Sequence, residues 1–163
     1  MKPSILVVCH ANVCRSPIAE GLLARRLPHF IVASAGVAAS DGQPADPLAC
    51  EVMQARGIDI SAHRSRRLDA RLCEEAALLL VMELEQRRYI ERCFPLVRGR
   101  VFSLGLNVEP HGAAAYFDIA DPHRGPRAAF EACATQMIHA IDAWARRIET
   151  LPVAAPSIDA GAY

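Results

Sequence analysis

Four short apolar runs, separated by stretches with helical patterns, constrain what this 163-residue chain can fold into. The first run, Ile5–Val8, is rich in β-favouring residues, as expected of a strand buried on both faces. For Ala76–Met82, length and position between polar segments favour a strand, although periodicity alone does not exclude a helix. Strands that alternate with helices form a parallel sheet, because parallel neighbours need crossover connections. The sequence therefore predicts an α/β fold, a three-layer sandwich with a central four-stranded parallel sheet. The four runs are Ile5–Val8, Phe30–Ala33, Ala76–Met82 and Val101–Leu104.

Helical patterns fill the intervals between these runs. Ser16 is expected to cap the first helix and Pro17 to occupy its first position, because serine accepts bonds from free N–H groups and proline is preorganised there. Residues 105–123 predict a long loop, and its length suggests a functional role. Further helices are expected at Asp46–Arg56, Glu83–Phe94 and Pro126–Leu151.

Length and composition fit one domain. Hydrophobic residues make up 52% of the chain, which is enough for a full core. A chain of this size buries roughly 70% of the surface that it exposes when unfolded. We expect the domain to span residues 1–151 and residues 152–163 to form a flexible tail, because the tail has too little apolar area to fold alone.

Charge and cysteine content narrow the class of protein. Eighteen basic residues against eighteen acidic ones argue against a nucleic-acid binder that relies on bulk electrostatics. No run approaches the roughly 18 apolar residues of a membrane span, and the N-terminal residues do not resemble a signal peptide. We therefore expect a cytoplasmic monomer that is not inserted in membranes, with its six cysteines reduced.

The segment between the first strand and the first helix reads CHANVCRSP, with a cysteine six positions before an arginine. Backbone N–H groups in such a loop can point inward and, with the helix N-terminus, form an anion site. The same field favours a thiolate at the cysteine, and the arginine offers a planar fork for two phosphoryl oxygens. The predicted phosphate-binding residues are Cys9, His10, Ala11, Asn12, Val13, Cys14 and Arg15.

The spacing alone is weak evidence, since it occurs again at Cys50 and Arg56. That second pair falls within the helix predicted over 46–56, where six residues turn through about 600° and leave the two side chains about 120° apart. They cannot surround one anion. Only Cys9 combines the spacing with a strand end and a helix start.

The CHANVCRSP segment resembles the signature of the low-molecular-weight protein tyrosine phosphatases, Cys-x-Gly-Asn-x-Cys-Arg-Ser-Pro. It departs from that signature at Ala11, where the family has glycine. The resemblance extends from Ile5 to about Leu151 and implies the phosphatase I-like fold, with no cofactor and no metal. If position 11 requires a positive φ, alanine costs about 1 kcal/mol there.

Residue roles follow from the resemblance. Cys9 is implied to attack phosphorus and form a cysteinyl phosphate, while Arg15 stabilises the transferring phosphoryl group. Ser16 assists the Cys9 thiolate. The other supporting residues implied by the resemblance are Asn12, His63 and Ser34. For His63, an ordinary surface or capping role stays open.

A general acid is also required, because protonation of the leaving phenolate is typically worth 10²- to 10⁴-fold in rate. The pair Asp121-Pro122 precedes the last helix. An Asp-Pro pair is common in turns, so the residues alone favour a turn. The resemblance assigns the general acid to Asp121, with Asp118 in reserve, and implies that Asp121 activates water in the second step.

The predicted substrate wall departs from the family pattern. Family members often carry an aromatic residue after the Asp-Pro pair, whereas this chain has His123 and Arg124, and Ser40 on the opposite side is not aromatic either. We expect a shallower or more polar entrance, with Arg124 favouring acidic substrates. Other details are similar to bacterial members that partner capsule and exopolysaccharide tyrosine kinases. The implied substrate is a phosphotyrosine protein, a tyrosine autokinase with a clustered tyrosine tail.

Three alternatives stay open. Arsenate reductases share the fold and the loop, but Cys73 and Cys93 are twenty residues apart and lie where helices would bury them. A zinc module on Cys9, His10 and Cys14 lacks paired Cys-x-x-Cys halves, whereas a reversible disulfide between Cys9 and Cys14 is more credible. The third alternative is a non-catalytic phosphate-binding relative.

Overall fold

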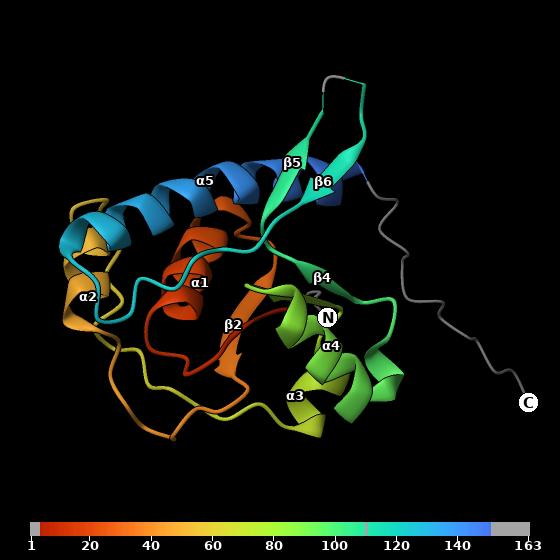
Figure 1. The fold of residues 1–163 in the computed structure, drawn as a ribbon, viewed down its shortest axis with the longest axis horizontal. Helices are drawn as coiled ribbons and strands as arrows, with labels where there is room; N and C mark the ends of the chain where they lie inside the picture. The colour runs from red at the N-terminus through yellow and green to blue at the C-terminus, as the bar shows by residue number, and fades with distance from the viewer. Residues whose placement is uncertain (1–3, 110, 151–163) are drawn as a thin grey trace, which may run out of the picture.

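Four parallel strands form the main sheet of the computed structural model, which describes residues 4–109 and 111–150. Their order is β2-β1-β3-β4, and each neighbouring pair is parallel. The three-layer α/β prediction is confirmed (Figure 1). The predicted tail, residues 152–163, lies outside the described residues. The strands are β1 Ser4–Cys9, β2 Ile31–Gly36, β3 Leu78–Val81 and β4 Val101–Ser103.

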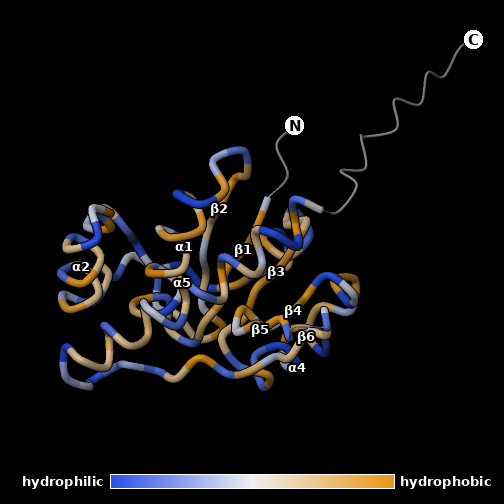
Figure 2. The backbone as a smooth tube through the Cα atoms, turned by 90° about the horizontal axis from the view of Figure 1, so that it is seen from above, coloured by the Kyte–Doolittle hydropathy of each residue, from blue (hydrophilic) through white to orange (hydrophobic). Residues whose placement is uncertain are grey.

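Two apolar layers cover the two faces of this sheet. Alternate residues of β1 point to opposite faces, so Ile5 and Val7 pack in one cluster and Leu6 and Val8 in the other. Apolar segments accordingly run through the centre of the molecule (Figure 2). The first cluster includes residues of α1 Arg15–Arg26, α2 Pro47–Gln54 and α5 Arg127–Thr150. The second includes residues of α3 Ala70–Glu75, α4 Leu84–Cys93 and the 3-10 turn η1 Pro95–Val97.

The prediction of a continuous loop over 105–123 is wrong in its first part. A β-hairpin occupies it, formed by the antiparallel strands β5 Leu106–Val108 and β6 Ala114–Tyr116. Strands of three residues are too short to show an alternating pattern. The helix α3 was also not predicted, because six residues do not reveal a helical period. Among the helices of the described residues, no helix is both long enough and apolar enough to cross a membrane.

Two helix starts differ in chemistry. Asp46 caps α2, accepting a hydrogen bond from the Leu48 amide at 2.8 Å. Ser16 does not cap α1, which already begins at Arg15 without a side-chain cap. Its hydroxyl contacts Cys9 instead. The helix α2 ends at Gln54, so Arg56 lies beyond it and pairs with Glu131 at 2.8 Å.

Candidate active site

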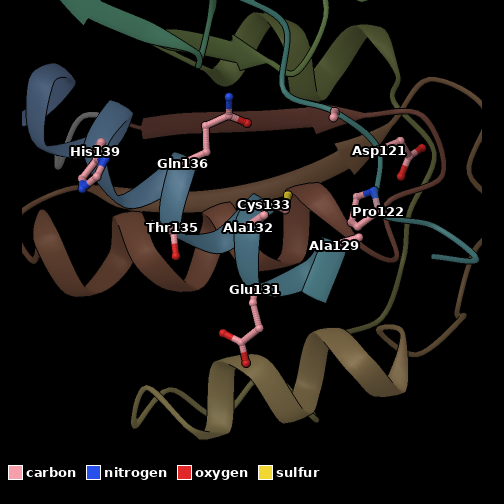
Figure 3. Close-up of a pocket in the computed structure, with 10 residues that line it drawn as sticks. Asp121, Pro122, Ala129, Glu131, Ala132, Cys133, Thr135, Gln136 and His139 are labelled. Atoms are coloured by element: carbon pink, nitrogen blue, oxygen red, sulfur yellow. The ribbon is translucent and has the colours of Figure 1, made fainter. Parts of the chain in front are cut away.

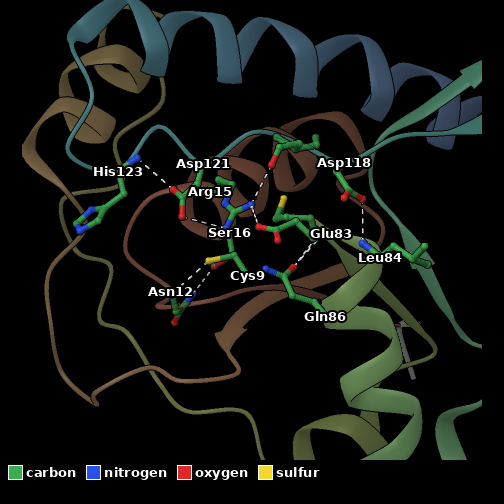
Figure 4. Close-up of polar contacts among 12 residues, drawn as sticks. Cys9, Asn12, Arg15, Ser16, Glu83, Leu84, Gln86, Asp118, Asp121 and His123 are labelled. Atoms are coloured by element: carbon green, nitrogen blue, oxygen red, sulfur yellow. Dashed lines mark hydrogen bonds and ion pairs between the residues drawn. The ribbon is translucent and has the colours of Figure 1, made fainter.

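Cys9 ends β1, an inner strand of the sheet, and the loop to α1 begins there. In parallel sheets, ligands bind beyond the carboxyl ends of the strands. The Cys9 Sγ lies 3.0 Å from the Ser16 hydroxyl and accepts a hydrogen bond from the Asn12 amide at 3.3 Å (Figure 4). The side chain is only 3% exposed. Two polar groups therefore surround the sulfur atom, and both can donate to a thiolate.

Asn12 is the strained residue of the loop. Its φ is 58°, in the left-handed region that asparagine tolerates better than most residues, and its side chain is buried. The side-chain amide donates to the hydroxyls of Ser16 and Ser34, each at 2.8 Å, and its oxygen accepts from the Arg66 amide at 2.9 Å. Among the described residues, Ala11 is not one with a positive φ. The cost considered for alanine at position 11 therefore does not arise.

A second layer of contacts holds Asn12 from outside. His63 Nε2 lies 2.8 Å from the backbone oxygen of Asn12, and His63 Nδ1 lies 3.9 Å from a Glu20 oxygen. The Ser34 hydroxyl donates to Glu20 as well. Three side chains that the sequence analysis named, Asn12, His63 and Ser34, thus meet in one network, and Glu20 is a member that it missed.

Arg15 is buried, with 2% of its side chain exposed, and is held by three acceptors. Its Nη1 contacts the Glu83 carboxylate and donates to the Ile119 carbonyl at 2.9 Å, while Nη2 donates to Asp121 Oδ2 at 3.0 Å (Figure 4). A guanidinium has five N–H donors, so these three contacts leave two for another acceptor. Glu83 was missed, although it stands just beyond a β3 end, where ligand-binding residues gather.

Asp121 and Asp118 have different surroundings. Asp121 is exposed to solvent, contacts Arg15 through one oxygen and accepts the His123 amide at 3.1 Å through the other. Asp118 accepts the Leu84 amide at 2.9 Å, at the start of α4 (Figure 4). Of these two aspartates, only Asp121 contacts Arg15, whereas Asp118 stabilises the N-terminal end of α4.

A cavity of about 300 Å³ lies against Arg15 and Asp121. Its wall includes an aromatic side chain, Tyr89 of α4, which no motif in the sequence places at this site. Its lining residues are His10, Arg15, Val37, Glu83, Glu85, Gln86, Tyr89 and Asp121. A wider groove of about 740 Å³ runs from Asp121 and Pro122 along the first turns of α5 (Figure 3). Asp121 lines both cavities, but of the two only the smaller one is lined by Arg15.

The three residues predicted as a substrate wall lie elsewhere around the loop. His123 is exposed, and its Nδ1 lies 3.7 Å from the Cys14 Sγ. Arg124 is exposed and has a φ of 60°. The Ser40 backbone oxygen accepts a hydrogen bond from the Ser65 hydroxyl, in the turn after β2. Among the described residues that line the 300 Å³ cavity, none of these three is present.

The other cysteines differ in environment. Burial first, and then the charge of Asp46, raises the pKa of the Cys14 thiol well above its ordinary value. Burial raises the pKa of Cys73 to about 11 and that of Cys133 to about 12. Cys73 packs on the sheet face opposite to Cys9. Cys93 is exposed, so the expectation that a helix would bury it is wrong.

Comparison with known proteins gives one family. The family model of the low molecular weight phosphotyrosine protein phosphatase matches residues 4–152. The chain is 45% identical over 151 residues to a probable low molecular weight protein-tyrosine-phosphatase EpsP of Ralstonia nicotianae, covering 93% of this chain and 99% of that protein.

Solved structures agree with this match. Wzb of Vibrio vulnificus in complex with benzylphosphonate superposes with a TM-score of 0.81 at 36% identity, covering 90% of this chain and 99% of that one. The YwlE arginine phosphatase from Geobacillus stearothermophilus gives 0.82 at 34% identity, covering 91% and 94%. With the family model matching nearly the whole chain, this protein belongs to the low molecular weight phosphotyrosine protein phosphatase family.

Proposed function

We propose that this protein hydrolyses protein phosphotyrosine through a cysteinyl-phosphate intermediate. In the first step the Cys9 sulfur attacks phosphorus, the bond to the tyrosine oxygen breaks, and Asp121 gives its proton to that oxygen. In the second step a water molecule attacks the cysteinyl phosphate, and Asp121 takes a proton from it. Inorganic phosphate leaves, and Cys9 is again a thiolate.

One observation carries this proposal: the Arg15 guanidinium and the Asp121 carboxyl line one cavity, and Cys9 lies beside them, directly before His10 of the cavity wall (Figure 4). The Ser16 hydroxyl at 3.0 Å and the Asn12 amide at 3.3 Å can stabilise the sulfur as attacking thiolate and as leaving group. The two free donors of Arg15 suit the equatorial oxygens of the transferring phosphoryl group. All these groups are preorganised, which is where electrostatic catalysis gains most.

Tyr89 supports an aromatic substrate. Its ring lines the cavity that contains Arg15, and aromatic rings pack against one another in offset or edge-to-face arrangements. We expect Tyr89→Ala to raise KM for phosphotyrosine more than for a small alkyl phosphate. Equal effects on both substrates would exclude a contact with the ring.

The protein substrate is the finer part of the proposal. The family resemblance of this sequence points to a tyrosine autokinase with clustered phosphotyrosines, in the control of exopolysaccharide or capsule synthesis. Arg124 is exposed in the acid loop, the segment 118–124 that carries Asp121, and it would attract negative charges of the substrate next to the phosphotyrosine. Arg124→Ala should then lose efficiency on an acidic phosphopeptide but not on phenyl phosphate. If the ratio of kcat/KM for the acidic phosphopeptide to kcat/KM for phenyl phosphate were the same in the wild type and in Arg124→Ala, this role would be contradicted.

Two properties of the working protein complete the proposal, a monomeric state and a cytoplasmic location. Light scattering on the purified chain at micromolar concentration should give a mass near 17.7 kDa. Fractionation of cells should recover the chain with cytoplasmic markers. A dimer mass, or recovery with secreted proteins, would contradict the corresponding part.

The central experiment measures hydrolysis of phosphotyrosine and of p-nitrophenyl phosphate in the presence of a metal chelator. Cys9→Ser should abolish both activities. Asp121→Asn should lower turnover of phosphotyrosine by about 10²- to 10⁴-fold and that of p-nitrophenyl phosphate less, because p-nitrophenolate needs less protonation to leave. Asp118→Asn is the matched control and should retain activity. Turnover that survives the serine substitution, or that requires metal, would overturn the mechanism.

Two further substrates separate the proposal from its neighbours in the fold. Phosphoarginine should be a poorer substrate than phosphotyrosine, and the reverse order would reassign the specificity. Arsenate should not drive oxidation of a thiol reductant, because Cys73 lies on the other face of the sheet from Cys9. Arsenate-dependent oxidation that a Cys73→Ser variant lacks would make the protein a reductase. The absence of any turnover would indicate a non-catalytic phosphate binder.

A further inference from the structure

Three side chains with metal-binding atoms meet beside the segment Cys9–Arg15, called the phosphate loop from here on. They are Cys14 in the loop, Asp46 at the start of α2, and His123 after the acid Asp121. One ligand atom from each, a sulfur, a carboxylate oxygen and an imidazole nitrogen, lies within 4.8 Å of the others. We propose that these three residues form a binding site for a borderline-soft divalent cation, of which Zn²⁺ fits best. This site goes beyond the proposed hydrolysis, since no step of that reaction uses these three side chains.

The geometry of the Cys14 and His123 pair suits zinc. The Sγ and Nδ1 atoms are 3.7 Å apart. With a zinc–sulfur bond of about 2.3 Å and a zinc–nitrogen bond of about 2.0 Å, tetrahedral angles place the two ligand atoms about 3.5 Å apart. Cys14 is buried, Asp46 is half-buried and His123 is exposed, so the site lies at the protein surface.

Two of the three proposed ligands, Asp46 and His123, are held by further contacts. The Asp46 Oδ1 accepts the Leu48 amide at 2.8 Å, which leaves Oδ2 for a cation, and the Asp46 amide donates to the Val13 carbonyl at 2.8 Å. The His123 amide donates to Asp121 at 3.1 Å. Contacts of this kind orient the ligands of metal sites in proteins. Access is from solvent past His123, whose ring points away from Arg15 and Cys9 (Figure 4).

The donor set selects the cation. One thiolate, one imidazole and one carboxylate suit Zn²⁺ and Co²⁺, while Mg²⁺ and Ca²⁺ prefer oxygen ligands alone. Three protein ligands leave a fourth position for water. Binding replaces the Cys14 thiol proton by the metal, so one proton is released for each cation bound. The bound cation would join the loop that carries Asp121 to the phosphate loop.

The test uses Co²⁺ as a spectroscopic probe on the full chain, purified with a chelator and then freed from it. A cobalt–thiolate complex has a charge-transfer band in the near ultraviolet, and four-coordinate cobalt has strong visible bands. We expect one equivalent of Co²⁺ to bind with both signals and an excess of Zn²⁺ to remove them. Cys14→Ser should lose the charge-transfer band. His123→Gln and Asp46→Asn should each weaken binding at least tenfold.

Controls distinguish this site from the catalytic cysteine. Cys9→Ser should keep the band, as should Cys93→Ser and His29→Gln, which change exposed side chains. A band that Cys9→Ser removes, or that survives Cys14→Ser, would overturn the assignment. Unchanged affinity in His123→Gln would overturn it too, because His123 is exposed and its substitution does not threaten folding. The 3.7 Å contact would then be only a thiol–imidazole hydrogen bond. These optical readouts do not depend on phosphatase activity.

Discussion

Replacing Asn12 by alanine tests the idea that this one side chain holds the phosphate loop in shape. The substitution removes two hydrogen bonds to hydroxyls and one from a backbone amide. At about 1 kcal/mol each, these account for about 3 kcal/mol. A left-handed backbone at φ 58° costs alanine about 1 kcal/mol more. We expect the free energy of unfolding to fall by about 4 kcal/mol.

Urea denaturation followed by circular dichroism measures this change, and thermal unfolding should show a midpoint lower by roughly 8–16 °C. Asn12→Gly is the matched variant, because it loses the same hydrogen bonds but accepts the positive φ. It should be more stable than Asn12→Ala by about 1 kcal/mol. A loss below about 1 kcal/mol in the alanine variant would refute the role of the network, and a glycine variant no more stable than alanine would refute the backbone argument.

Three other perturbations test the site and the core. Glu83→Gln should lower kcat/KM for an aryl phosphate roughly tenfold, because the Arg15 Nη1 loses its charged partner. An unchanged kcat/KM would contradict this and would mean that the other contacts of Arg15 hold the guanidinium in place. Gly36→Ala should lower kcat/KM at least tenfold, because a Cβ at position 36 would lie 2.6 Å from the His10 carbonyl oxygen and displace the loop that follows Cys9. Full activity of the variant would contradict this displacement. The raised pKa of Cys73, from 9.0 to about 11, favours the folded state below pH 9, and this contribution is lost as pH rises from about 9 to 11. Between pH 8 and pH 10, the free energy of unfolding should therefore fall by roughly 1 kcal/mol more in the wild type than in Cys73→Ser. An equal fall in the two proteins would contradict this prediction.

The four strands and the long helices were predictable, because their signals are local. A continuous apolar run such as that of β3 needs no knowledge of its neighbours to be recognised as buried. The short elements were not predictable. The hairpin of β5 and β6 and the helix α3 carry too few residues for a period to emerge, and they persist because the rest of the fold packs against them.

Within the site, the sequence determined the loop from Cys9 to Arg15, because its residues are contiguous and stand between a strand and a helix start. It also suggested Asp121. The role of Ser16 changed, because Ser-Pro predicts a cap from local chemistry alone, whereas the fold brings a sulfur atom within 3.0 Å of the hydroxyl.

Tertiary structure alone decided which distant residues meet that loop. Glu83 and Tyr89 reach it because β3 lies beside β1 in the sheet and α4 follows β3. Cys14, Asp46 and His123 come together because the start of α2 and the acid loop both pack against the phosphate loop. No spacing along the chain encodes such meetings, since they depend on strand order and helix packing. The sequence thus determined which residues form the loop from Cys9 to Arg15, and the fold determined which residues contact it.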